Sequence, residues 1–352
     1  MRNVVWLLAR PVRRARRDRV LVLQPYRGFG SPERVLLIGR VMRQPKPIDP
    51  RDPLARDAVD VVRRLLRKGV GGETVRARLH GAVAATVTDG DGYFRFDLPV
   101  VDRGGNGRSG WQSVALQLER DPSVAVTARV FLHPPDARCL VISDIDDTVV
   151  ETGVANRLVM LWRLFVLGPR SRAAVPGFAA LLRALHRGPL GTERNPVVFV
   201  SRAPWTIYET LDAFFRLQRF PRDSVLFLRE WGLRWYRPVA RRDRAHKRAL
   251  IRHLLETAPH LPVILIGDSG QEDAEIYAGV VADFPGRVAA VMIRDLGHSP
   301  ERERAIRSLE LDLGRAGARL VLATSSLPMA EAMAELGLIP PGAVAQVRAG
   351  LG

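Results

Sequence analysis

From Arg138 onward, short apolar runs alternate with stretches that have helical periodicity. The apolar runs are continuous, which is the pattern of strands buried on both faces. When helices separate such strands, the pattern predicts a parallel sheet with helices on both faces. The runs are CLVIS, PVVFVS, VLFL, PVILIG, VAAVMI and ARLVLA. We therefore expect an α/β unit over residues 136–352.

The hundred or so residues before this unit have a different rhythm, with β-branched runs separated by turn residues. Asp89-Gly90-Asp91-Gly92 lies between two of these runs and predicts a tight hairpin turn. Several short antiparallel strands favour a β-sandwich, and TVTDGDGYFRFDLP resembles the hairpin of transthyretin-like accessory domains. We expect an accessory β-sandwich at residues 31–135, after a basic segment at residues 1–30. HPPDAR, residues 133–138, marks the junction with the α/β unit.

The chain is strongly basic, with 54 Lys and Arg against 37 Asp and Glu and a net charge of +17. Such a surface attracts polyanions, which include nucleic acid, anionic lipid headgroups and phosphorylated substrates. The coding bias of a genome explains an arginine excess equally well. The basic segment is either an amphipathic helix on an anionic membrane or an ordinary solvated helix. Since no run reaches about 18 apolar residues, we expect no transmembrane span.

The chain has one cysteine, Cys139. It therefore cannot form an intramolecular disulfide, and nothing in its composition indicates an oxidising compartment. This favours a cytoplasmic location. Where the basic segment lies on an anionic membrane, the protein is also peripheral at the inner face of that membrane.

Polar side chains follow three of the predicted parallel strands. Asp144 and Asp146 come after CLVIS, Ser201 after PVVFV, and Asp268 after VILIG. Ligands of such sheets bind at the carboxyl ends of the strands, so we expect these side chains at one edge. Neighbouring carboxylates repel each other unless a cation lies between them, and oxygen ligands suit Mg²⁺. The sequence therefore predicts a magnesium site at this edge.

A metal beside a second carboxylate suits phosphoryl transfer. One carboxylate attacks phosphorus to give an aspartyl-phosphate, and a neighbouring acid protonates the leaving oxygen. Lys247 in RAHKRAL and the Ser201 hydroxyl are candidates for holding the phosphate, with Arg202 as a second cation. An EF-hand calcium loop is excluded, because Val149 and Ala155 stand where that loop needs Gly and Glu.

Four motifs occur in the order of the haloacid dehalogenase (HAD) superfamily: DIDDT, the Ser of VFVSRAPW, the Lys of HK, and GDSGQEDAEIY. More narrowly, residues 138–293 are similar to the catalytic domain of the actin-patch-associated phosphatidate phosphatases of yeast and their bacterial relatives. The resemblance implies a Rossmann-like HAD parallel sheet and a Mg²⁺-dependent phosphatase. It also implies phosphatidate or a related lipid phosphate as substrate.

The resemblance also implies roles for single residues. Asp144 is the nucleophile and a Mg²⁺ ligand, and Asp146 is the general acid and then base, which also offers its backbone carbonyl to the metal. Ser201 and Lys247 hold the phosphoryl group, and Asp268 binds the metal directly. Asp273 is a ligand or lies just behind the ligands, with Glu272 as its alternative. Apart from the resemblance, we expect Arg202 and Thr148 at the substrate, with Thr148 bonding backbone rather than reacting. Many relatives have Ser-Asn-Ser-Pro where this chain has SRAP, which leaves the substrate preference open.

Each residue also has a structural interpretation. A strand-end Asp or Ser is commonly a helix N-cap, and a Lys on a basic helix is commonly solvated. The short chain between Thr148 and Ser201 leaves room only for a small cap, and such an open site suits a bulky or surface-bound substrate. The apolar, arginine-bearing segment at residues 156–172 either contacts lipid or is a helix buried on the sheet.

Three classes of function remain. The first is a lipid phosphatase, and the second is a HAD phosphatase of a soluble metabolite or phosphoprotein. The third is a non-enzymatic basic module that binds membrane or nucleic acid. The pair Asp144 and Asp146 disfavours the third class, so nucleic acid is not the expected partner. The oligomeric state is not predicted.

Overall fold

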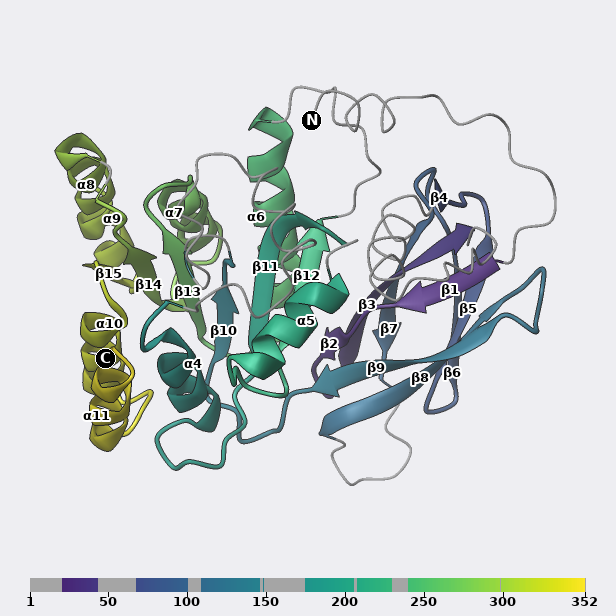
Figure 1. Cartoon of the computed structure of the whole chain (residues 1–352), viewed down its shortest axis with the longest axis horizontal. Helices are drawn as coiled ribbons and strands as arrows, with labels where there is room; N and C mark the ends of the chain where they lie inside the picture. The colour runs from purple at the N-terminus through teal and green to yellow at the C-terminus, as the bar shows by residue number, and fades with distance from the viewer. Residues whose placement is uncertain are drawn as a thin grey trace, which may run out of the picture.

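The computed structural model describes residues 21–43, 68–100, 109–145, 148, 175–205, 208–229, 240–297 and 299–351. They form two sheets, one from each half of the chain, which are the purple-to-blue and teal-to-yellow parts of Figure 1. Three earlier predictions lie outside these residues: the first twenty positions of the basic segment, the segment 156–172, and Asp146.

The first sheet has nine strands in the described residues. They are β1 (Leu21–Pro25), β2 (Gly28–Gly30), β3 (Arg34–Arg43), β4 (Lys68–Gly69), β5 (Thr74–Leu79), β6 (Ala82–Val87), β7 (Tyr93–Pro99), β8 (Gly110–Leu118) and β9 (Ala125–Leu132). The order is β1-β3-β2-β9-β8-β5-β6, and β4 and β7 also pair with β3. The pairs are antiparallel except β2 with β9. These pairings join all nine strands, so a sandwich of two separate sheets is not confirmed.

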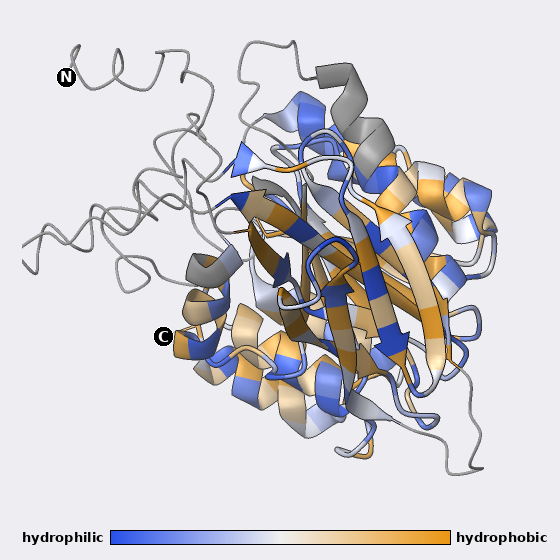
Figure 2. Ribbon diagram, turned by 90° about the vertical axis from the view of Figure 1, so that its right-hand side faces the viewer, coloured by the Kyte–Doolittle hydropathy of each residue, from blue (hydrophilic) through white to orange (hydrophobic). Residues whose placement is uncertain are grey.

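Side chains of this sheet alternate between the core and the solvent, as the period of a strand requires. In β5, Val75, Ala77 and Leu79 are buried and the arginines between them are exposed. In Figure 2 the strands nearest the viewer show this alternation as bands of orange and blue. The alternating pattern therefore identified these strands correctly.

The predicted hairpin is wrong in its pairing but right in its turn. The Asp89 carboxylate accepts hydrogen bonds from the backbone N–H of Asp91 (2.9 Å) and Tyr93 (2.8 Å), which closes a tight turn. However, β7 pairs with β3, while β6 pairs with β5. The two-residue hairpin lies earlier, at His80 and Gly81, whose φ angles of 49° and 90° fit a type I′ turn.

The second sheet has six parallel strands in the described residues. They are β10 (Leu140–Ser143), β11 (Val197–Pro204), β12 (Val225–Arg229), β13 (Val263–Asp268), β14 (Val288–Arg294) and β15 (Arg319–Ala323). They match the six apolar runs. The order is β12-β11-β10-β13-β14-β15, so the direction of winding reverses between β10 and β13. A reversal of this kind opens a crevice for ligands at the carboxyl ends of the two strands.

Helices connect these strands, and α10 (Ser326–Glu335) and α11 (Pro341–Ala349) follow the last one. The connecting helices are α4 (Phe178–Arg187), α5 (Tyr208–Leu217), α6 (Ala240–Thr257), α7 (Asp273–Asp283), α8 (Pro300–Arg307) and α9 (Glu310–Arg315). Local sequence explains their boundaries: α8 begins at Pro300, and the Ser299 side chain caps it by accepting a hydrogen bond from the Arg302 N–H. Among the described helices, none is both long and apolar enough to cross a membrane.

One hydrophobic core spans both sheets, and a second core lies within the first half of the chain alone. Phe29, Leu36 and Phe131 of the first sheet belong to the same buried cluster as the strands of the second. Tyr26 stacks on Trp205, which follows β11, with ring centroids 3.8 Å apart. The first sheet therefore packs directly against the α/β part, at the strand that carries Ser201.

Cys139 provides a test of this packing. The side chain is fully buried just before β10, and burial raises the pKa of its thiol to about 12. Because the thiolate is the reactive form, we expect no reaction of the native protein with a disulfide reagent at neutral pH. One thiol per chain should react after unfolding in urea. Stoichiometric labelling of the folded protein would contradict this placement.

Candidate active site

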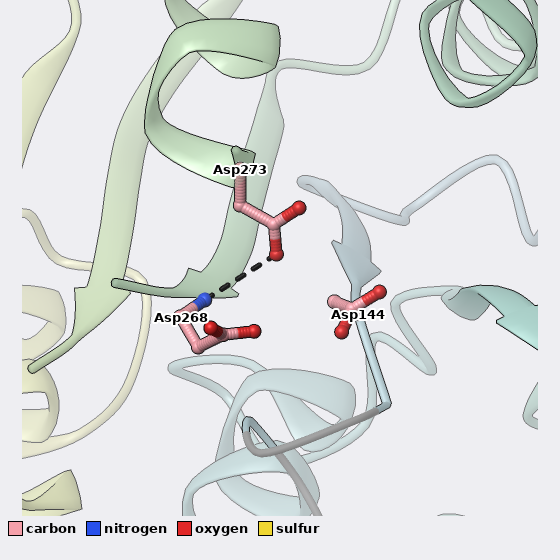
Figure 3. A group of neighbouring side chains, drawn as sticks. All are labelled: Asp144, Asp268 and Asp273. Carbon is pink, nitrogen blue, oxygen red and sulfur yellow. Dashed lines mark hydrogen bonds between the residues drawn. The ribbon is translucent and has the colours of Figure 1, made fainter. Parts of the chain in front are cut away.

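Three carboxylates converge at the carboxyl edge of the parallel sheet (Figure 3). Asp144 follows β10, Asp268 ends β13, and Asp273 begins α7. One oxygen from each lies within 4.8 Å of the others, and all three residues are at most 1% exposed. The cluster lies where the winding of the sheet reverses. The structure thus brings together three of the residues that the sequence pointed to.

The backbone of two neighbouring strands positions these carboxylates. Ser143 pairs with Ile266, and the Asp144 N–H donates to the Ile266 carbonyl at 2.8 Å. At Gly267, a Cβ atom would lie 2.4 Å from Asp273 Oδ2 and 2.6 Å from Asp273 Cβ, closer than real contacts allow. The glycine therefore gives the Asp273 carboxylate its space. In that space Asp273 Oδ2 accepts a hydrogen bond from the Asp268 N–H at 3.3 Å.

Lys247 of α6 neutralises part of this charge. Its Nζ donates to Asp144 Oδ1 at 2.7 Å and to Asp273 Oδ1 at 2.5 Å, and its side chain is 2% exposed. Burial alone would lower the pKa of Lys247. The charges of the two carboxylates and their hydrogen bonds outweigh it, so the pKa lies above its ordinary value. Lys247 therefore stays charged at neutral pH, in contrast to its alternative interpretation as a solvated surface lysine.

Two residues of the site were not singled out from the sequence. Gln271 donates from its backbone N–H to Asp268 Oδ1 at 2.9 Å and from its side-chain amide to Oδ2 at 3.1 Å. It holds both oxygens of Asp268 in place. The other is Gly267, whose role depends on its contact with Asp273, six residues further along the chain. Both belong to the quoted motif GDSGQEDAEIY, but its letters do not show which members support the others.

The remaining predicted residues are described to different extents. Ser201 lies in β11, where Ser143 pairs with Phe199, so Ser201 lies about level with Asp144 at the same edge. Ser201 and Thr148 are both buried. Arg202 is part of β11, but its side chain is outside the described part, as is all of Asp146. Glu272 is the residue before the first turn of α7.

The donor set fits a divalent cation. Oxygen-only ligands from carboxylates are what hard cations such as Mg²⁺ and Ca²⁺ prefer. In the described part of the chain, the three buried carboxylates lie close together around the Lys247 ammonium, and a bound cation would offset the cost of burying like charges side by side. Asp144, Asp268 and Asp273 are the residues that would hold such an ion.

The comparison with known families agrees with this location. Residues 139–295 match the family described as phosphatidate phosphatase APP1, catalytic domain. This confirms the resemblance inferred from the motifs, and it supports a phosphatidate phosphatase-like hydrolase. The matched range contains the three carboxylates of the cluster and Lys247.

Two curated proteins are similar over the same region. An uncharacterised protein of Schizosaccharomyces pombe is 33% identical over 160 residues, which are 44% of this chain and 25% of that protein. Phosphatidate phosphatase APP1 of Saccharomyces cerevisiae is 26% identical over 158 residues, 45% of this chain and 26% of that protein. The aligned region thus spans about a quarter of the length of either relative.

Similarity to solved structures is low. A carbohydrate acetylesterase from Xanthomonas citri superposes with a TM-score of 0.28 at 9% identity, covering 87% of this chain and 69% of that one. This likeness carries no argument about the fold or activity of the present chain.

The buried lysine gives a test of the site that does not depend on activity. In Lys247→Met, the carboxylates of Asp144 and Asp273 lose their buried partner, which typically costs about 3–5 kcal/mol. We expect the free energy of unfolding in urea, followed by circular dichroism, to fall by that amount. A divalent cation should restore part of the loss, because it replaces the missing positive charge.

Lys68→Met is the matched control, because Lys68 is exposed on β4, a strand of the first sheet that carries none of the cluster residues. Its effect should stay within about 0.5 kcal/mol. Equal stability of the two variants would show that the Lys247 pairs do not hold the site together.

Proposed function

We propose that this protein is a Mg²⁺-dependent phosphatase that hydrolyses phosphomonoesters through an aspartyl-phosphate intermediate, with phosphatidate or a related lipid phosphate as substrate. The observation that carries the proposal is the coincidence of two independent findings. The match to a phosphatidate phosphatase catalytic domain covers residues 139–295, and the buried cluster of Asp144, Asp268, Asp273 and Lys247 lies within that range. We further propose residues 136–352 as the catalytic unit and residues 31–135 as its accessory domain.

Asp144 is the nucleophile in this proposal. Its Oδ1 is held by Lys247 at 2.7 Å, which fixes the orientation of the carboxylate. The other oxygen attacks phosphorus, an O–P bond forms, and the bond from phosphorus to the leaving oxygen breaks. A bound Mg²⁺ would supply charge neutralisation for the phosphoryl oxygens.

Proton transfer is assigned to Asp146. It gives its proton to the leaving oxygen and then takes one from the water that attacks the aspartyl-phosphate. This second step releases inorganic phosphate and restores the Asp144 carboxylate. Ser201 and Lys247 bind phosphoryl oxygens, and Thr148 and Arg202 contribute to substrate binding.

The substrate class rests on the resemblance and on charge. The relative from Saccharomyces cerevisiae is named a phosphatidate phosphatase, and the net charge of +17 favours anionic surfaces. We place the protein in the cytoplasm with a peripheral contact at the inner face of the membrane. The alternative is a phosphatase of a soluble metabolite or phosphoprotein. A non-enzymatic membrane-binding or nucleic-acid-binding role is disfavoured, because such a role does not need a buried carboxylate cluster.

The decisive experiment measures phosphate release from phosphatidate in detergent micelles, with Mg²⁺ or with a chelator. We expect turnover only with Mg²⁺, and a loss of at least about 1,000-fold in kcat for Asp144→Asn, because the nucleophile is removed. Asp268→Asn should show a higher Mg²⁺ requirement. Asp283→Asn, which alters an exposed carboxylate paired with Arg248 and Arg252, is the control and should retain activity.

A panel of soluble phosphomonoesters compared by kcat/KM tests the substrate class. A clear preference for soluble esters would replace the lipid proposal with its alternative. Full turnover by Asp144→Asn would overturn the mechanism.

Gly267→Ala tests the positioning of Asp273 without removing any functional group. The added Cβ would lie 2.4 Å from Asp273 Oδ2, so the carboxylate must move. Because small misplacements in an active site are costly, we expect kcat/KM to fall by about 100-fold. Gly314→Ala is the control, since its Cβ would meet nothing within 4 Å. Unchanged activity of Gly267→Ala would show that Asp273 need not occupy its observed position.

A further inference from the structure

A second charged feature lies at the opposite edge of the parallel sheet. It is a groove of about 990 Å³ between the two halves of the molecule. One wall is formed by α4, α5 and the loop that precedes β12, and the other includes Trp111 of β8 and Arg129 of β9. The loops that line it lead into β11 and β12, so it lies at the amino ends of the strands. The carboxylate cluster lies at their carboxyl ends.

Among the described residues, eight arginines and only two carboxylates line this arginine groove. Both carboxylates already have partners. Asp212 pairs with Arg216 and with Arg27 at 3.2 Å. Asp223 pairs with Arg194 at 2.7 Å, and it also accepts a hydrogen bond from Trp111 Nε1 at 2.7 Å.

The other five arginines have no carboxylate partner within the described part of the chain: Arg129, Arg183, Arg187, Arg219 and Arg222. Arg183 donates to the Arg219 carbonyl at 2.8 Å, and the Arg129 guanidinium lies 4.8 Å from the centroid of the Trp111 ring. Burial, together with the charges of Arg187 and Arg219, lowers the pKa of Arg183. The groove therefore holds an excess of positive charge that its own side chains do not balance.

This excess of arginine side chains indicates a ligand that carries phosphate groups. The planar guanidinium group matches the oxygens of a phosphate in bidentate geometry, and charges inside a concave site act more strongly than on an open surface. The volume lies in the range of small-molecule sites, which is roughly 300–1,000 Å³. A compact ligand with several negative charges fits it better than a long nucleic-acid duplex.

We propose that the arginine groove binds a ligand with two or more phosphate groups, either a free polyphosphate or the headgroup of a phosphorylated lipid. Both sources present the same chemistry to the guanidinium groups. Because the two walls of the groove come from different halves of the chain, the ligand would bridge the accessory and catalytic parts. The site is separate from the proposed phosphatase site and does not depend on it.

The test uses the full chain and two triple variants with the same change of charge. One is Arg129→Gln, Arg187→Gln and Arg222→Gln, which removes exposed arginines from three parts of the groove. The other is Arg304→Gln, Arg315→Gln and Arg348→Gln, which removes exposed arginines from α8, α9 and α11. Urea denaturation should show that both variants fold like the parent chain.

Calorimetric titration with inorganic tripolyphosphate, in the presence of a chelator, measures the binding of a free polyphosphate. Flotation with phosphatidylcholine vesicles that contain phosphatidylinositol bisphosphate measures the binding of a phosphorylated lipid headgroup. For at least one of these two probes, we expect the groove variant to bind at least about tenfold more weakly than the parent, and the control variant to stay within about twofold. Asp144→Asn should bind like the parent, which separates this site from the catalytic one.

Three outcomes would overturn the proposal. The first is equal binding of the parent chain and the groove variant for both probes. The second is an equal loss in both triple variants, which would show that net charge alone attracts the anion. Binding of a DNA duplex that depends on the groove, without binding of either phosphate probe, would also contradict it. The relative affinities for tripolyphosphate and vesicles identify which source supplies the ligand.

Discussion

Lys247 lies at the centre of a buried ionic cluster on which the candidate site depends. Its ammonium group connects α6 to Asp144 after β10 and to Asp273 at the start of α7, so one side chain links three elements. Burying charges is costly, and a buried pair with one partner missing is more costly still. The cluster is therefore stable only as a unit. Gly267 and Gln271 complete it by making space for Asp273 and by holding Asp268.

Contacts from the first sheet also support the α/β half of the molecule, next to β11 and α5. Tyr26 stacks on Trp205, and the Arg27 guanidinium pairs with Asp212 of α5 at 3.2 Å. Trp205 comes four residues after Ser201, so this stacking braces the end of the strand that carries the serine. An accessory domain connected only by a flexible linker would not act in this way. Here one hydrophobic core spans both sheets, so the position of the carboxyl edge of the parallel sheet depends on the packing of both.

Sequence reasoning succeeded where the physical cause is local and failed where it is not. The six parallel strands were predictable because burial on both faces leaves a continuous apolar run. Asp144 and Asp268 were predictable as neighbours because parallel strands end at one edge. The Asp89 turn was also local, but the partner of the strand after it was not: β7 pairs with β3, and the paired residues are 53 to 65 positions apart in the chain. The arginines of the groove come from positions between 27 and 222, so no single stretch of the sequence indicates that they converge.

The arrangement of charge argues against a uniform arginine excess as the whole explanation of the composition. A coding bias would scatter arginine over the surface, where each side chain finds water or a nearby carboxylate. Instead, among the described residues, opposite charges concentrate at the two edges of one sheet: three carboxylates around one lysine at the carboxyl edge, and eight arginines around two aspartates at the amino edge. Each edge therefore gathers mainly side chains of one sign. Unbalanced charge in a concave or buried place is unfavourable unless a ligand of opposite sign compensates it. The same argument that leads from the carboxylate cluster to a cation therefore leads from the arginine groove to an anion.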